Sequence, residues 1–175
     1  MDVAAVYLEL FGRIPPLVRE VLDGLTVDDL LARPAPDANP IGWLLWHLTR
    51  VQDDHVADVM GVEQLWASGG WAALFGLAPD TWDGYRNIGY GHDSADVARV
   101  RPAGPAAIVA YHDAVDARTR DYLSRLSATE LDRIVDERWD PPVTLGVRLV
   151  SVADDSLQHV GQAAYLKGLL AAGRA

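Results

Sequence analysis

The sequence lacks several features that mark well-known classes of protein. Its 175 residues include no cysteine, which excludes disulfide bonds, thiolate metal ligands and a cysteine nucleophile. It has no apolar run of roughly 18 residues or more, the length that a membrane-spanning helix needs. The first residues, which include Asp2, show no basic segment before an apolar run, unlike a secretory signal. We therefore expect a cytoplasmic protein with no membrane partner.

Basic residues are also few, and they do not cluster. The formal net charge is -10, and nucleic-acid binding requires a basic patch, so we expect no nucleic-acid partner. The sequence contains neither a GxSxG motif for a serine nucleophile nor a glycine-rich phosphate loop. Hydrophobic residues make up 50% of the chain and charged residues 23%, as in ordinary globular proteins, and the length suits one domain over residues 1–175.

Apolar residues recur at three- and four-residue steps in four long segments, which predicts four long helices. Pro15 and Pro16 should interrupt the first helix, because adjacent prolines remove two backbone donors. Asn39 should cap the second helix, with Pro40 in its first turn, and Gly61 should end it. We therefore predict an all-α fold, a four-helix bundle built from residues 1–24, 41–61, 105–126 and about 145–170.

Residues 62–104 join the second and third long helices and show little periodicity. They contain three tryptophans and seven glycines. We predict a long irregular connection with one or two short helical pieces, one of them starting at Ser94. Connections of this length inside a compact fold are usually functional. The aromatic side chains either wall a substrate pocket or only cover one end of the bundle. His92 is expected to be a solvated loop residue.

The last helix carries two ionisable residues, Asp155 and His159, beside its apolar stripe. They are four residues apart, so their side chains lie one turn apart on the same side. A carboxylate and an imidazole placed this way can ligate a metal ion at about 2 Å. They can equally form a structural hydrogen bond with each other. The pattern in this segment leaves both interpretations open.

The second long helix directs two histidines, His47 and His55, toward the interior. They are eight residues apart, about 12 Å along a helix axis, so they cannot bind the same ion. His47 can supply one metal ligand at most from this helix, because Trp43 and Val51 occupy the positions one turn away. His55 is expected to be a buried core histidine that hydrogen-bonds to a carboxylate or a carbonyl.

On the third long helix, His112 and Asp116 are also four residues apart. They lie on a charged flank with Arg120, where a surface ion pair is the better interpretation. Beyond this helix, a capping-box pattern at residues 127–130 predicts a short helix. Residues 134–147 are expected to be extended or irregular.

Two segments carry a resemblance to a known family. Residues 40–55, PIGWLLWHLTRVQDDH, resemble the second helix of the DinB-like superfamily, in which a tryptophan and a few apolar residues precede a metal-binding histidine. Residues 158–170, QHVGQAAYLKGLL, are similar to the last helix of that superfamily, where a histidine precedes a Gly-Gln or Gly-His pair. The stretches LSATELDR and GYGHDSADV are similar to connecting segments of its actinobacterial, mycothiol-dependent members.

The resemblance implies a metal site. His47 matches the histidine of the second helix, and His159 matches the histidine of the last helix. Many members have a further histidine four residues before the latter, where this chain has Asp155. Asp154 is a poorer substitute, because it points about 140° away from His159 around a helix. The implied cofactor is one divalent metal, Zn, Ni or Fe, held by two histidines and a carboxylate with positions left open.

Relatives in this family suggest chemistry on low-molecular-weight thiols. A thiol such as mycothiol would bind the metal as thiolate and attack an electrophilic substrate, which would make the protein an S-transferase or a thiol-dependent isomerase. Two alternatives stay open. One is a metal-binding or stress-linked bundle without catalysis, and the other is a bundle without metal in which His47 and Asp155 pair in the core. The resemblance also implies a homodimer formed through the bundle helices.

Overall fold

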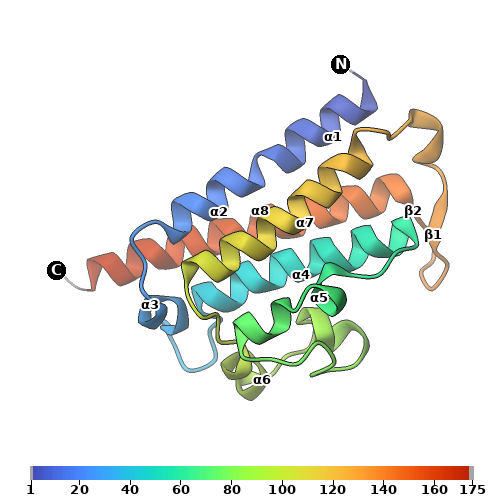
Figure 1. Ribbon diagram of the computed structural model, residues 1–175. Coiled ribbons are helices and arrows are strands. Elements are labelled where there is room, and N and C mark those ends of the chain that lie inside the picture. The colour runs from blue at the N-terminus through green and yellow to red at the C-terminus, as the bar shows by residue number, and fades with distance from the viewer. Residues whose placement is uncertain (1, 174–175) are drawn as a thin grey trace.

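Four long helical segments pack side by side in a bundle, which confirms the predicted all-α fold (Figure 1). The computed structural model describes residues 2–173. The first segment is split into α1 (Val3–Gly12) and α2 (Ile14–Leu22), and the other three are α4 (Ile41–Met60), α7 (Pro105–Leu123) and α8 (Leu145–Ala172). Shorter elements join them: α3 (Val27–Leu31), α5 (Leu65–Ser68), η1 (Trp71–Phe75), η2 (Gly84–Ile88), α6 (Ser94–Arg99), η3 (Ala128–Glu130), β1 (Ile134–Asp136) and β2 (Val143–Thr144).

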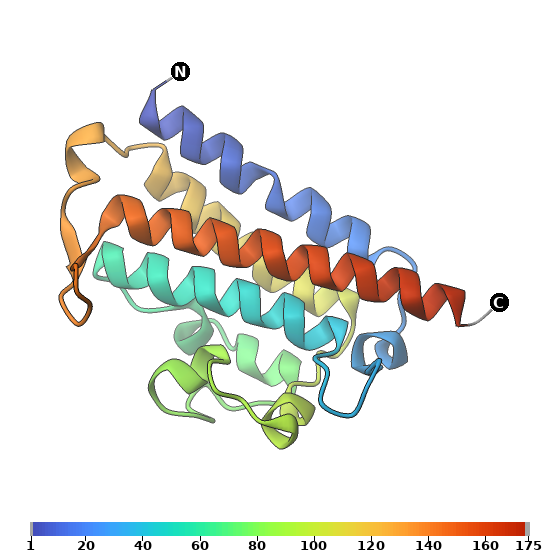
Figure 2. The ribbon, with the colours of Figure 1, turned by 180° about the vertical axis from the view of Figure 1, so that it is seen from behind.

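The direction of the helices explains the long connection between α4 and α7. The first segment and α8 run one way along the bundle, whereas α4 and α7 both run the other way (Figures 1 and 2). α4 has 20 residues, about 30 Å of helix. The chain must therefore travel back along the bundle before α7 can begin. Residues 61–104 make this return and cover α4 on its outer side.

Local sequence signals set most of the helix ends. The interruption at the two prolines is confirmed, since α1 ends at Gly12 and α2 begins at Ile14. Gly61 ends α4 in the left-handed region, with a φ of 66°. The predicted Asn39 cap is wrong, because Pro40 occupies the cap position and no side chain caps this end of α4 within the described residues. Of the segment 134–147, which was expected to be extended or irregular, residues 134–144 form a two-stranded antiparallel hairpin and the remainder is the first turn of α8.

α4 is the central helix of the bundle, and 17 of its 20 residues are buried. α7 and α8 pack against it, and the connection of residues 61–104 closes the rest of its surface. Trp46, for example, contacts Trp66 and Trp82 of that connection, with ring centroids 6.1 Å apart in both pairs. Periodicity predicts one buried face, whereas the connection buries a second one.

A buried carboxylate ties the connection to α4. Asp53 accepts hydrogen bonds from the backbone N–H groups of Leu65 (3.0 Å) and Trp66 (2.8 Å) and from the Tyr111 hydroxyl of α7 (2.8 Å). Its side chain and that of Arg50, 3.4 Å away, are both fully buried. Three separate segments therefore meet on one charge.

His112 contradicts the prediction of a surface ion pair with Asp116. It is 1% exposed, and its Nδ1 lies 3.2 Å from the Thr49 hydroxyl of α4. That hydroxyl already donates to the Leu45 carbonyl, so the Nδ1–H of His112 donates to it. Nε2 has no hydrogen-bond partner in the described part of the chain. Burial lowers the pKa of His112 to about 4. The prediction failed because α7 is covered on two sides, by α4 and by the α1–α2 segment.

Removing the Asp53 carboxylate should destabilise the protein strongly. Asp53→Ala leaves the buried Arg50 charge without its partner and frees two backbone donors, a loss of about 3–5 kcal/mol in the free energy of unfolding. Urea denaturation measures it. Asp58→Ala, an exposed position on the same helix, is the control and should change little. Equal effects of the two substitutions would contradict the role given to Asp53.

Acid should destabilise the protein partly through His112. Its pKa is lowered from 6.5 to about 4 on folding, so the unfolded chain binds a proton that the folded protein rejects. The stabilisation is complete above pH 6.5 and is lost as the pH falls toward 4. One such group costs about 2 kcal/mol between pH 7 and pH 5. Between pH 7 and pH 5, the free energy of unfolding measured by urea denaturation should fall by about 2 kcal/mol less in His112→Leu than in the wild type. An equal fall in both proteins would contradict the lowered pKa of His112.

Candidate metal site

The antiparallel packing of α4 and α8 brings the three predicted ligands together. One ligand atom from each of His47, Asp155 and His159 can be chosen so that all three lie within 4.8 Å of one another. His47 Nε2 is 3.8 Å from Asp155 Oδ1, and His159 Nε2 is 3.6 Å from the same oxygen. Direct hydrogen bonds span about 2.7–3.2 Å. Donor atoms that share one ion at about 2 Å lie roughly 3–4 Å apart, so the spacing suits a shared ion better than a hydrogen bond.

Hydrogen bonds on the far side of each ring aim both histidines at this point. His47 Nδ1 contacts the backbone carbonyl of Ile88, and His159 Nδ1 lies 2.8 Å from the Gln162 side-chain oxygen. A carbonyl oxygen only accepts, so each Nδ1 carries the proton and each Nε2 keeps its lone pair. Such outer contacts fix the orientation of metal-binding histidines.

Asp155 has an oxygen that the protein leaves unsatisfied. Its side chain is 18% exposed, and Oδ2 is buried without a hydrogen-bond partner among residues 2–173. A buried carboxylate oxygen without a partner costs free energy unless a cation lies beside it. The neighbouring Asp154 is exposed and accepts a hydrogen bond from Gln158. Two neutral imidazoles and a carboxylate suit Zn, Ni or Fe, so the residues present fit a divalent metal.

The two histidines differ in their affinity for protons. Burial lowers the pKa of His47 to about 4, so this ring is neutral at physiological pH. Burial also acts to lower the pKa of His159, but its contacts with Asp155 and Gln162 outweigh that effect, and the pKa is raised. Protons therefore compete with a metal for His159 Nε2 more strongly than they would at an ordinary histidine, so metal binding should weaken in acid.

Trp43 of α4 supports the His47 ring, and the return connection holds Trp43 in turn. Trp43 stacks on His47 at 4.7 Å, and its Nε1 donates to His92 Nδ1 at 3.1 Å. His92 Nε2 lies 2.8 Å from the Arg86 carbonyl, and its ring stacks on Trp46 at 5.7 Å. The prediction of a solvated loop histidine is therefore wrong. His92 clamps the connection to α4, and nothing local in the sequence shows this, because the partners are 49 residues apart.

Gly89 lets the connection approach His47 closely. Its φ is +109°, and a Cβ at this position would lie 2.6 Å from His47 Nδ1. Only glycine therefore allows the neighbouring Ile88 carbonyl to accept from the ring. Ile88, Gly89 and Gln162 are the supporting residues that sequence reasoning missed. For Ile88 and Gly89 the available signal was the Gly-Tyr-Gly run at residues 89–91, which marks a turn without giving its partner. For Gln162 it was the Gly-Gln pair after His159, which the family resemblance pointed out without a role.

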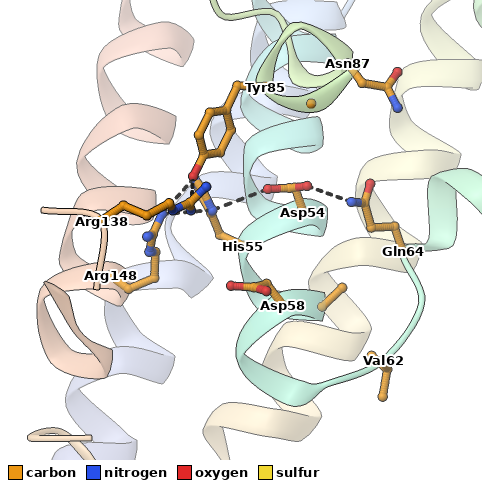
Figure 3. A pocket seen from close by; sticks show the side chains of 11 residues that line it. Asp54, His55, Asp58, Val62, Gln64, Tyr85, Asn87, Arg138 and Arg148 are labelled. Atoms are coloured by element: carbon orange, nitrogen blue, oxygen red, sulfur yellow. Dashed lines mark hydrogen bonds and ion pairs between the residues drawn. The ribbon is translucent and has the colours of Figure 1, made fainter. Parts of the chain in front are cut away.

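His55 lies away from the three ligands, as predicted, and it is buried. It lines a polar cavity of about 480 Å³ (Figure 3). Its Nδ1 is 3.4 Å from an Asp54 oxygen and 3.0 Å from Nη1 of Arg148. Burial, and next the Arg148 charge, lower the pKa of His55 to about 4. The ring is therefore neutral and serves as a contact between α4 and α8.

These features define a class of protein, a helical bundle with a candidate metal site between two antiparallel helices. Residues 10–163 match the DinB superfamily, and the chain belongs to that superfamily. The crystal structure of the conserved protein of locus from Enterococcus faecalis is similar, with 32% sequence identity and a TM-score of 0.85 over 95% of this chain and 96% of that one. No curated protein matches the chain. No helix in residues 2–173 is both long and apolar enough to cross a membrane.

Filling the space at Gly89 should weaken metal binding without changing any ligand. Gly89→Ala pushes the Ile88 carbonyl away from His47, and loss of such an outer contact typically costs about 10–100-fold in affinity. Competition with a chromophoric zinc chelator measures the change. Gly91→Ala is the matched control, because its φ is also positive (+70°) while the nearest atom to its Cβ is 3.8 Å away. Equal weakening by both substitutions would contradict the proposed contact.

Proposed function

We propose that the protein binds one divalent metal ion, Zn, Ni or Fe, through His47, Asp155 and His159. The observation that carries the proposal is the arrangement of these side chains, in which both Nε2 atoms face a carboxylate with an unsatisfied buried oxygen. Membership of the DinB superfamily supports it. Three protein ligands leave coordination positions open, which is typical of sites that act on a bound molecule.

We further propose that the site activates a small thiol, of the mycothiol type, for attack on an electrophilic substrate. A metal bound here would lower the pKa of the thiol and hold it as thiolate at neutral pH. His47 is kept neutral by burial and is held by Ile88, so it requires no rearrangement. Trp43 and Tyr90 pack against the His47 ring and exclude water from one side of it. S-transfer and thiol-dependent isomerisation are the two reactions that this arrangement would serve.

The alternative is a metal-binding bundle without catalysis. The same three ligands would serve it, so metal content alone does not separate it from the enzyme. Thiol-dependent consumption of a model electrophile by the metal-loaded protein separates the two. Consumption that stops on chelation supports the enzyme, whereas no consumption with any thiol tested supports the bundle without catalysis. A homodimer and the absence of nucleic-acid partners remain part of the proposal.

Metal content is the first test. Untagged protein, analysed for its elements after incubation with Zn, Ni or Fe, should hold close to one ion per chain. His159→Ala and Asp155→Ala should each lose it, because two ligands do not retain a divalent ion in water. Asp154→Ala is the matched control, since it removes an adjacent carboxylate that is exposed, and it should keep the metal. Wild-type protein without metal after all three incubations would overturn the proposal.

A further inference from the structure

A second cavity lies beside the candidate metal site. It measures about 370 Å³, within the usual range for pockets that hold small molecules. It shares three residues with the polar cavity of Figure 3, where Arg148, Tyr85 and His55 converge at one end. Five side chains line it: His55, Tyr85, Tyr90, Trp139 and Arg148.

Arg148 supplies the one formal charge among these five side chains, because His55 is neutral. Its Nη2 donates to Asp136 at 2.9 Å. Asp136 also accepts two hydrogen bonds from Arg138, at 2.8 and 2.9 Å, so a second cation already balances its charge. The Arg148 side chain is 11% exposed, and its Nε is buried without a hydrogen-bond partner in the part of the chain described here. Arg148 therefore brings to the cavity wall a positive charge whose hydrogen-bonding capacity the protein does not fully use.

The other walls of the cavity are aromatic. Tyr85 lies 6.1 Å from Tyr90 and 6.4 Å from His55, measured between ring centroids. Trp139, at the tip of the β1–β2 hairpin, is 63% exposed. An exposed tryptophan that faces a cavity has apolar area available to cover a ligand. Flat, electron-rich walls of this kind suit a flat ring.

The cavity adjoins the metal ligands through a single residue. The Tyr90 ring, which lines the cavity, packs edge-on against His47 at 5.3 Å. Arg148 and Asp155 are seven residues apart on α8, so they share one face of the helix at a separation of about 10 Å along its axis. Arg148 therefore lies on the same side of α8 as Asp155, and Tyr90 lies between the cavity and His47.

We infer that this cavity binds a small aromatic carboxylic acid. The carboxylate contacts Arg148, and the ring lies among Tyr85, Tyr90 and Trp139. A planar guanidinium recognises a carboxylate through paired hydrogen bonds. That this acid is the electrophilic substrate rests on the proposed function, whereas its binding does not, because no metal ligand lines the cavity.

Titration calorimetry and ligand-observed NMR with benzoate test the inference, with benzyl alcohol as the uncharged compound of the same ring. Benzoate should bind at least about tenfold more tightly, since a charge-assisted contact is worth that much. Arg148→Gln should weaken benzoate binding about tenfold and leave benzyl alcohol unchanged. Trp139→Leu should weaken both. Arg99→Gln is the control, because it removes an arginine charge next to an aromatic ring, that of Trp82, but outside the cavity.

Equal affinity for benzoate and benzyl alcohol would overturn the inference. It would also be overturned if Arg99→Gln weakened benzoate binding as much as Arg148→Gln does. If Arg148→Gln does not fold, Trp139→Leu decides, because this exposed residue can change without disturbing the core. Unchanged benzoate binding in Trp139→Leu would then overturn the inference. The titrations are run on metal-free and zinc-loaded protein. Benzoate binding without zinc uptake refutes the metal proposal alone, and zinc uptake without benzoate binding refutes this inference alone.

Discussion

The antiparallel contact between α4 and α8 is the feature on which both proposed sites depend. It sets His47 opposite Asp155 and His159, and two turns further along it sets His55 beside Arg148. Residues seven or eight positions apart lie on the same face of a helix, so a single alignment of α4 against α8 brings both groups of side chains together. A shift of that register by one residue would turn the ligands of one helix through about 100° and separate them from those of the other.

Burial of polar groups shapes the rest of the core. His47, His55 and His112 each have a pKa lowered to about 4, with burial as the largest cause. Their partners differ: a backbone carbonyl, an arginine and a hydroxyl. Neutral rings of this kind keep a lone pair available, and at His47 that lone pair faces Asp155. The same desolvation that costs free energy therefore prepares the ring to bind a metal.

The return connection between α4 and α7 is more than a linker. Asp53 fixes its beginning, and His92, Ile88 and Gly89 fix its later part against α4. Sequence reasoning recognised that a long connection rich in tryptophan and glycine is usually functional. It left open whether the aromatic side chains wall a pocket or only cover the bundle. The structure supports both interpretations, since Trp66 and Trp82 pack in the core while Tyr85 and Tyr90 line cavities.

The sequence alone determined the four long helices, the break at Pro15 and Pro16 and the end at Gly61, because periodicity, proline and glycine act within a few residues. It also placed Asp155 and His159 on one face, and the family resemblance added His47. Only the tertiary structure decided which flanks are buried. His112 and His92 were placed at the surface because their helix or loop looks polar locally, yet α4 buries His112 and its tryptophans bind half-buried His92. His47 and Ile88 are 41 positions apart in the sequence, and His55 and Arg148 are 93 apart. Contacts at such separations leave no local pattern, so the support of His47 and the environment of Arg148 became visible only in the folded chain.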